Sequence, residues 1–367
     1  MVHPENDEAY KGLRVNDGVE RLSSVNPYLS QRRVKRAAPL SVDDYVQGIL
    51  RGDVTVLSRA VTLVESLLPE HQAVAQEVVE KLLPYSGKSL RVGITGVPGA
   101  GKSTSIDAFG MHILKERGGK LAVLAVDPSS ERSKGSILGD KTRMERLSAH
   151  PDAFIRPSAS AGSLGGVARK TRETIVLCEA AGYDTVFVET VGVGQSETAV
   201  YSMVDFFLLI QIAGAGDELQ GIKRGIMEMA DAIVINKADG ANIEEAQRAA
   251  VHYRSALQLF PMPQSGIRPQ VLTYSGFYDL GIKEIWDMVF SYFEKVKANG
   301  SFDARRNGQA KYWMYETINE QLHRRFYQAA GMEEMLARYE QDIIDGRVTS
   351  FAAAGKLLEL YDKMYNK

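Results

Sequence analysis

Cysteine is almost absent from this sequence of 367 residues, which contains a single one, Cys178. A lone thiol excludes an internal disulfide, and it cannot by itself hold zinc or an iron–sulfur cluster. An excess of charge of one sign is lacking too, because 44 basic residues face 46 acidic ones and the net charge is −2. Proteins that bind nucleic acid by electrostatic attraction are usually basic. The composition therefore predicts no nucleic-acid partner.

Long hydrophobic runs are missing as well. The longest apolar candidate, residues 206–213, falls far short of the roughly 18 residues that a membrane-spanning helix needs. The first residues, MVHPENDEAYKGLRVNDG, carry acidic side chains early and no apolar stretch, unlike a secretory signal or a transit peptide. We therefore expect a cytoplasmic protein with no membrane association.

What the chain does contain is typical of a folded globular protein, with 44% hydrophobic and 25% charged residues. Its length allows roughly two or three domains. Residues 1–40 are polar and predict a loosely ordered N-terminal arm. Apolar residues recur at helical spacing in 41–88 and again in 299–367. We expect a helical N-terminal segment and a helical C-terminal arm on either side of a larger domain, 89–298.

The larger domain has the sequence pattern of an α/β fold. Short apolar runs alternate with helical segments, and strands buried on both faces of a parallel sheet read as such runs. We therefore predict a three-layer α/β domain with a mostly parallel sheet. The seven predicted strands are LRVGIT (90–95), LAVLAV (121–126), AFIRP (153–157), TVFVE (185–189), FFLLIQIA (206–213), AIVIN (232–236) and QVLTY (270–274).

A phosphate-binding loop follows the first of these strands. The residues that fit G-x-x-x-x-G-K-[ST] are Gly96, Val97, Pro98, Gly99, Ala100, Gly101, Lys102 and Ser103, with Thr104 next to them. Glycines let backbone N–H groups turn toward phosphates, and the following helix directs the positive end of its dipole at the same anion. Lys102 is expected to contact the β- and γ-phosphates, Ser103 to bind Mg²⁺ and Thr104 to lie at the α-phosphate. The domain is thus predicted to be a P-loop NTPase.

A second motif selects the base. Asn236, Lys237 and Asp239 form N-K-x-D directly after the strand AIVIN, where open α/β sheets bind ligands. The carboxylate of Asp239 can accept hydrogen bonds from two donors of guanine, and adenine offers neither, so GTP is preferred to ATP. The loop Ser275, Gly276 and Phe277 follows the next strand, where such proteins offer backbone N–H groups to guanine O6.

Carboxylates at strand ends predict a magnesium and catalytic centre. Asp127 ends one strand and Glu189 another, and hard oxygen ligands suit Mg²⁺. Asp127 is alternatively a helix cap. Asp140 is a third acidic candidate, either in a mobile switch or on a solvated helix face. Gln195 either orients the attacking water or belongs to an ordinary glycine-rich turn. The polar residues 214–223 form either a loop that responds to the nucleotide or a plain connector.

At these motifs the sequence resembles the methylmalonyl-CoA mutase-associated G proteins, the MeaB/ArgK-type GTPases related to the human methylmalonic aciduria type A protein. The resemblance covers about residues 45–300. The matching blocks are 96–104, 126–130, 135–144, 189–197, 216–223 and 236–239.

The resemblance implies a GTPase that is homodimeric through its C-terminal helices and that binds an adenosylcobalamin-dependent methylmalonyl-CoA mutase. GTP hydrolysis would gate cofactor loading and protect or reactivate the mutase, and an adenosyltransferase that supplies the cofactor is a further expected partner. Adenosylcobalamin would be held by the mutase and not by this chain. Lys102, Asp127, Asp140 and Glu189 match the catalytic and Mg²⁺ positions, and 214–223 matches an additional switch.

Two other functions use the same phosphate loop. A P-loop kinase linked to amino-acid transport is the first alternative, but N-K-x-D argues against it because most such kinases use ATP. A GTPase that delivers nickel is the second, and it would need a cluster of cysteine and histidine near the switches, which this sequence lacks.

Overall fold

The structure is a computed structural model that describes residues 40–126, 143–157, 164–190, 196–214 and 224–365. The predicted site residues Asp127, Asp140 and Gln195, and most of the loop 214–223, lie outside these described residues.

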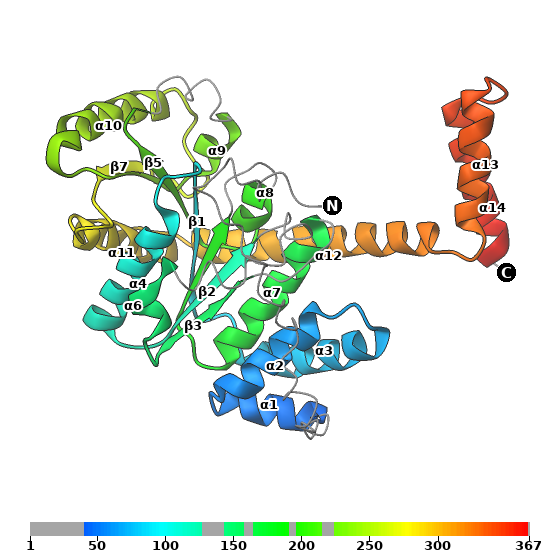
Figure 1. Ribbon diagram of the computed structural model, residues 1–367, viewed down its shortest axis with the longest axis horizontal. Helices are drawn as coiled ribbons and strands as arrows, with labels where there is room; N and C mark the ends of the chain where they lie inside the picture. The colour runs from blue at the N-terminus through cyan, green and yellow to red at the C-terminus, as the bar shows by residue number, and fades with distance from the viewer. Residues whose placement is uncertain (1–39, 127–142, 158–163, 191–195, 215–223, 366–367) are drawn as a thin grey trace, which may run out of the picture. The chain divides into compact units, whose positions relative to one another are not determined.

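A parallel sheet of seven strands, in the order β3-β2-β4-β1-β5-β6-β7, forms the centre of the described chain (Figure 1). Each apolar run predicted as a strand forms one, and the predicted fold class is confirmed. Parallel pairing brings the carboxyl ends of all strands to one edge. The strands are β1 (Leu90–Gly96), β2 (Leu121–Val126), β3 (Ala153–Arg156), β4 (Thr185–Thr190), β5 (Phe206–Ile212), β6 (Ala232–Asn236) and β7 (Gln270–Thr273).

Helices cover both faces of this sheet, because side chains of successive strand residues point to opposite faces. On β5, Leu208 and Ile210 join the cluster formed with α4 and α11, whereas Leu209 joins the cluster formed with α10. No helix in the described part is long and apolar enough to cross a membrane. The helices of this domain are α4 (Lys102–Arg117), α6 (Glu145–Ser148), α7 (Leu164–Ala180), α8 (Ser196–Tyr201), α9 (Arg224–Met229), η4 (Gly240–Asn242), α10 (Ile243–Leu257) and α11 (Ile282–Ala298).

The N-terminal helices α1 (Val42–Leu50), α2 (Val54–Glu65) and α3 (Pro69–Leu82), followed by η2 (Leu83–Tyr85), pack on one another and on α7. Asp53 caps α2, because its Oδ1 accepts hydrogen bonds from the N–H groups of Thr55 (2.8 Å) and Val56 (3.2 Å). Lys170 of α7 donates to the carbonyl oxygen of Glu65 at 2.9 Å. These contacts hold the N-terminal helices on the α7 side of the sheet.

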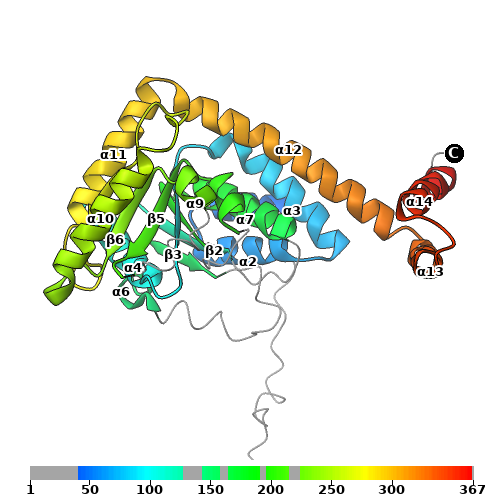
Figure 2. The same cartoon turned by 90° about the horizontal axis from the view of Figure 1, so that it is seen from above.

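The C-terminal arm consists of α12 (Ser301–Tyr327), α13 (Met332–Ile344) and α14 (Ser350–Tyr365). In both views α12 runs past the sheet and carries α13 and α14 at its far end (Figures 1 and 2). Trp313 is buried on α12, where its Nε1 donates to the carbonyl oxygen of Ser202 at 3.0 Å. Beyond Trp313 large apolar side chains of α12 are exposed, including Tyr315, Ile318 and Leu322.

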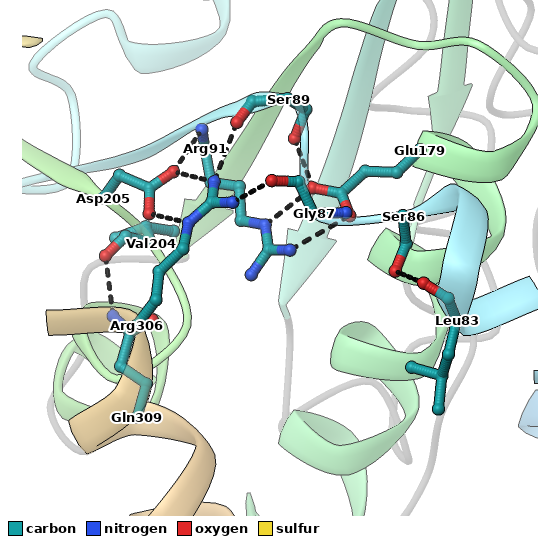
Figure 3. Close-up of polar contacts among 10 residues, drawn as sticks. All are labelled: Leu83, Ser86, Gly87, Ser89, Arg91, Glu179, Val204, Asp205, Arg306 and Gln309. Atoms are coloured by element: carbon teal, nitrogen blue, oxygen red, sulfur yellow. Dashed lines mark hydrogen bonds and ion pairs between the residues drawn. The ribbon is translucent and has the colours of Figure 1, made fainter. Parts of the chain in front are cut away.

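A buried polar cluster attaches α12 to the amino end of β1 and β5 (Figure 3). The guanidinium of Arg306 donates to both carboxylate oxygens of Asp205, with distances of 2.7 and 2.6 Å. It also donates to the carbonyl oxygens of Gly87 and Ser89. Next to it, Arg91 pairs with Glu179 at 2.8 Å. Charge-assisted, bidentate hydrogen bonds of this kind fix geometry as well as adding stability.

We expect Arg306→Ala to lower the free energy of unfolding by about 3 kcal/mol, because it leaves the buried Asp205 carboxylate without its cation. The Asp205 side chain is only 1% exposed. Denaturant unfolding followed by circular dichroism measures the change. Arg347→Ala is the matched control, because this arginine likewise forms ion pairs, with Asp342 and Asp345, but is 60% exposed, and it should cost at most about 1 kcal/mol. Equal losses in the two variants would contradict the expectation.

Candidate functional site

The loop between β1 and α4 has the backbone geometry of a phosphate cradle. Gly99 and Gly101 have φ angles of +78° and +84°, a region that L side chains rarely adopt. A Cβ at Gly101 would lie 2.6 Å from Nδ2 of Asn236, and one at Gly96 would lie 2.3 Å from the carbonyl oxygen of Ile210. Only glycine fits at Gly96 and Gly101, so the glycines of the motif are required by the packing of the loop itself.

Lys102 lies at the start of α4, and its side chain turns back toward this loop. Its Nζ donates to the carbonyl oxygens of Gly96 at 3.0 Å and Val97 at 3.4 Å. Burial lowers the pKa of the Lys102 ammonium, and the charges of Glu189 and Glu197 act in the opposite direction. The structure thus holds the lysine in place beside the loop, with two acidic side chains near enough to affect its charge.

Asn236, at the end of β6, connects the phosphate loop to the 275–277 loop. Its Nδ2 donates to the carbonyl oxygen of Ala100 at 2.7 Å, and its Oδ1 accepts from the N–H of Gly276 at 3.0 Å. The side chain is buried. Its burial makes these bonds costly to lose, since an unpaired buried amide is penalised. The two predicted parts of the site are therefore joined by one side chain.

Asp239 is oriented by a hydroxyl group of the same loop. Ser275 Oγ donates to Asp239 Oδ2 at 2.6 Å, and Ser275 and Leu280 exchange two backbone hydrogen bonds of 3.0 Å. Lys237 has a φ angle of +62°, an unusual conformation for a residue with a side chain. Unusual backbone angles of this kind concentrate at ligand sites.

A cleft of about 930 Å³ opens at this carboxyl edge of the sheet. Gly96, Val97, Ala100, Asn236, Asp239 and Ser275 are not part of its wall and support it through the contacts above. The predicted site residues that line it are Pro98, Gly99, Gly101, Lys102, Ser103, Thr104, Glu189, Lys237, Gly276 and Phe277. The structure therefore brings the phosphate loop, the end of β4 and the loops predicted to select the base to one cleft.

Several residues of the cleft were not predicted from the sequence. Arg143, in the block 135–144 that carries the resemblance, lines the cleft, and so do Asp107, Glu145 and Arg146, which belong to none of the matching blocks. Arg146 donates to Asp107 Oδ2 at 2.6 Å and to both carboxylate oxygens of Asp279, at 2.7 and 3.1 Å. In the sequence these are ordinary charges in helical segments, with no motif to mark them. Glu197 does not line the cleft, but its charge acts to raise the pKa of Lys102.

The described donor set suits magnesium. Ser103 and Glu189 offer a hydroxyl and a carboxylate oxygen in the same cleft, and Mg²⁺ in phosphate-binding sites usually takes one or two protein ligands together with the phosphates and water. No group of three or more histidine, cysteine or acidic side chains suited to a metal occurs among the described residues. The cleft thus fits a metal that is bound jointly with a phosphate ligand.

Known proteins with similar sequences have related names. Residues 57–331 match the family described as "Methylmalonyl Co-A mutase-associated GTPase MeaB". A probable GTPase of Mycobacterium tuberculosis is 48% identical over 320 residues, which are 87% of this chain and 95% of that protein. The mouse mitochondrial methylmalonic aciduria type A homolog is 44% identical over 330 residues, covering 87% and 79% of the two chains.

A solved structure is similar over most of the chain. The crystal structure of an LAO/AO transport system kinase superposes with a TM-score of 0.70 at 37% sequence identity, and the match covers 87% of this chain and 97% of that one. The shared architecture and the relatives named as GTPases identify this chain as a GTP hydrolase on a P-loop fold.

Proposed function

Since the chain belongs to the methylmalonyl-CoA mutase-associated GTPase family, we propose that it is a chaperone for an adenosylcobalamin-dependent methylmalonyl-CoA mutase in the cytoplasm. In this proposal GTP hydrolysis gates the loading of the cofactor and protects or reactivates the mutase. Adenosylcobalamin stays on the mutase, and an adenosyltransferase supplies it. The observation that carries the nucleotide part is the Asn236 bridge, which joins the phosphate loop to the base-selecting loop.

The proposed reaction is attack of water on the γ-phosphorus of GTP, with cleavage of the bond to the β-phosphate oxygen and release of GDP and phosphate. Lys102 binds the β- and γ-phosphates, and backbone N–H groups of the phosphate loop surround them. Ser103, Asp127, Asp140 and Glu189 are the proposed Mg²⁺ ligands, direct or through water. When bound, Mg²⁺ neutralises charge on the phosphates. The proposed catalytic residues are Lys102 and these three acids.

Base selection is proposed to rest on Asp239, which accepts hydrogen bonds from N1–H and the amino group of guanine. Ser275 fixes the orientation of this carboxylate through the 2.6 Å hydrogen bond. Lys237 lies along the base. Of the three backbone N–H groups predicted to serve guanine O6, those of Ser275 and Gly276 already donate to Leu280 and Asn236, so this role is proposed for the N–H of Phe277. The proposed organisation of the chain is a loosely ordered N-terminal arm (1–40), a helical N-terminal segment (41–88), the GTPase domain (89–298) and a helical C-terminal arm (299–367).

The C-terminal arm is proposed to form a homodimer. Exposed apolar side chains continue along its helices, and they include Ile318, Leu322 and Leu358. Apolar surface of this extent on a helix usually marks an interaction site. A second copy of the arm is a self-complementary partner for such a surface.

A binding experiment tests the partner. Purified mutase is mixed with the full-length protein in the presence of GDP, a non-hydrolysable GTP analogue or no nucleotide, and the complex is measured by pull-down and calorimetry. We expect a stable complex whose affinity depends on the nucleotide. Failure to bind the mutase in all three states would contradict the chaperone function while leaving the GTPase activity untouched.

A kinase is the alternative function, and the name of the similar LAO/AO transport system kinase is the observation that favours it. GTP carrying a labelled γ-phosphate separates the two in the presence of candidate acceptors. All of the label should appear as inorganic phosphate. Label on an acceptor would instead support the kinase.

A further inference from the structure

Two adjacent aromatic side chains stand exposed beside the cleft. Phe277 is 77% exposed and Tyr278 is 60% exposed, with their rings in edge-to-face contact at 4.9 Å. Exposing an aromatic ring to water is unfavourable, because it leaves a large apolar surface unburied. Their exposure therefore calls for a reason in the surrounding structure.

The loop that carries them is firmly held, so its local structure fixes where the rings stand. Ser275 and Leu280 close it with two backbone hydrogen bonds of 3.0 Å. The N–H of Gly276 donates to Asn236, and Arg146 binds Asp279 of the same loop with two hydrogen bonds. A binding residue on such a supported loop is positioned before its ligand arrives.

Only one of the two aromatic residues lines the cleft. Phe277 contributes to the wall together with Gly276 and Lys237, whereas Tyr278 does not. Lys237 belongs to the same motif as Asp239, which is hydrogen-bonded to the loop through Ser275. The exposed ring of Phe277 thus lies at the end of the cleft where the base is proposed to bind.

We infer that the Phe277 side chain is a stacking platform for the guanine base. The role rests on the proposed nucleotide site and extends it, because the predicted contribution of Phe277 was only its backbone N–H. An aromatic ring beside a purine contributes affinity through its face and does not distinguish one base edge from another. Asp239 then supplies selectivity for guanine, and Phe277 supplies affinity for any purine that enters.

Nucleotide titrations of the full-length protein test this inference. We expect Phe277→Ala to raise the Kd of GDP about tenfold to a hundredfold, as loss of one base–aromatic stack usually does. Phe277→Trp should keep the Kd within about threefold of the wild type, because it retains a stacking face. Tyr278→Ala is the matched control, an exposed neighbouring ring outside the cleft, and should leave the Kd within about twofold. Thermal unfolding without nucleotide checks that all variants are folded.

Inosine diphosphate separates stacking from recognition of the base edge, because it lacks the 2-amino group. Phe277→Ala should weaken GDP and inosine diphosphate by the same factor, whereas Ser275→Ala, which releases Asp239, should reduce the preference for GDP. A wild-type Kd in Phe277→Ala, or an equal loss in Tyr278→Ala, would overturn the stacking role alone. Wild-type protein that binds no guanine nucleotide would overturn the proposed nucleotide site together with it.

Discussion

Lys102→Ala is expected to reduce kcat/KM for GTP hydrolysis about a hundredfold to a thousandfold, the loss typical of removing one charge-stabilising donor from an active site. The ammonium is the cation of the phosphate loop, and Gly96 and Val97 hold it there before GTP binds. Part of the loss should appear as weaker nucleotide binding, because the phosphates lose the positive charge of the Lys102 ammonium. Phosphate release under steady-state conditions measures the change.

Lys115 provides the control for this substitution. It lies on the same helix, α4, and is exposed, so Lys115→Ala changes the charge of the helix without touching the cleft. Its kcat/KM should remain within about twofold of the wild type. The proposed role of Lys102 would be wrong if Lys102→Ala, shown to be folded by circular dichroism, kept more than a tenth of the activity.

Asp239→Asn is expected to lower kcat/KM for GTP about a hundredfold and to raise activity with xanthosine triphosphate. The substitution removes an acceptor for two guanine donors, and hydrogen bonds to a charged group contribute about 1.5–3 kcal/mol each. Xanthine has a carbonyl where guanine has its amino group, so the amide of asparagine can donate to it. The preference for GTP over xanthosine triphosphate, measured as the ratio of their kcat/KM values, should therefore be reversed or nearly reversed.

Asp287→Asn serves as the comparison, because Asp287 lies on α11 with a 61% exposed side chain and pairs only with Lys283 among the ion pairs of the described chain. Its nucleotide preference should equal that of the wild type. An unchanged preference for GTP in Asp239→Asn would mean that another group reads the base edge.

The strand pattern made the fold predictable. Strands such as β5 (Phe206–Ile212) and β6 (Ala232–Asn236) are buried on both faces, so they appear in the sequence as unbroken apolar runs. Their parallel arrangement followed from the helices between them, and the sheet order then placed Gly96, Glu189 and Asn236 at one edge. The placement of the motifs depends only on the order and direction of the strands, so the predicted and observed positions agree closely.

The side-chain connections were not predictable in the same way. Arg146 contacts Asp107 across 39 residues and Asp279 across 133, and no local pattern marks partners that only folding brings together. Phe277 was predicted to belong to the site because it follows a strand, but the exposure of its side chain depends on how the loop closes. Asp127 and Asp140 lie outside the described residues, so their roles stay predictions.

The contacts of Arg306 with Gly87 and Ser89 also bear on how this domain can be built into larger proteins. They place the point where the chain enters β1 next to the point where it leaves along α12. Domains whose two ends are neighbours can be inserted into other chains with little distortion. The two ends of the α/β domain therefore lie side by side at the amino edge of the sheet, so that an insertion at this point leaves the cleft at the carboxyl edge open.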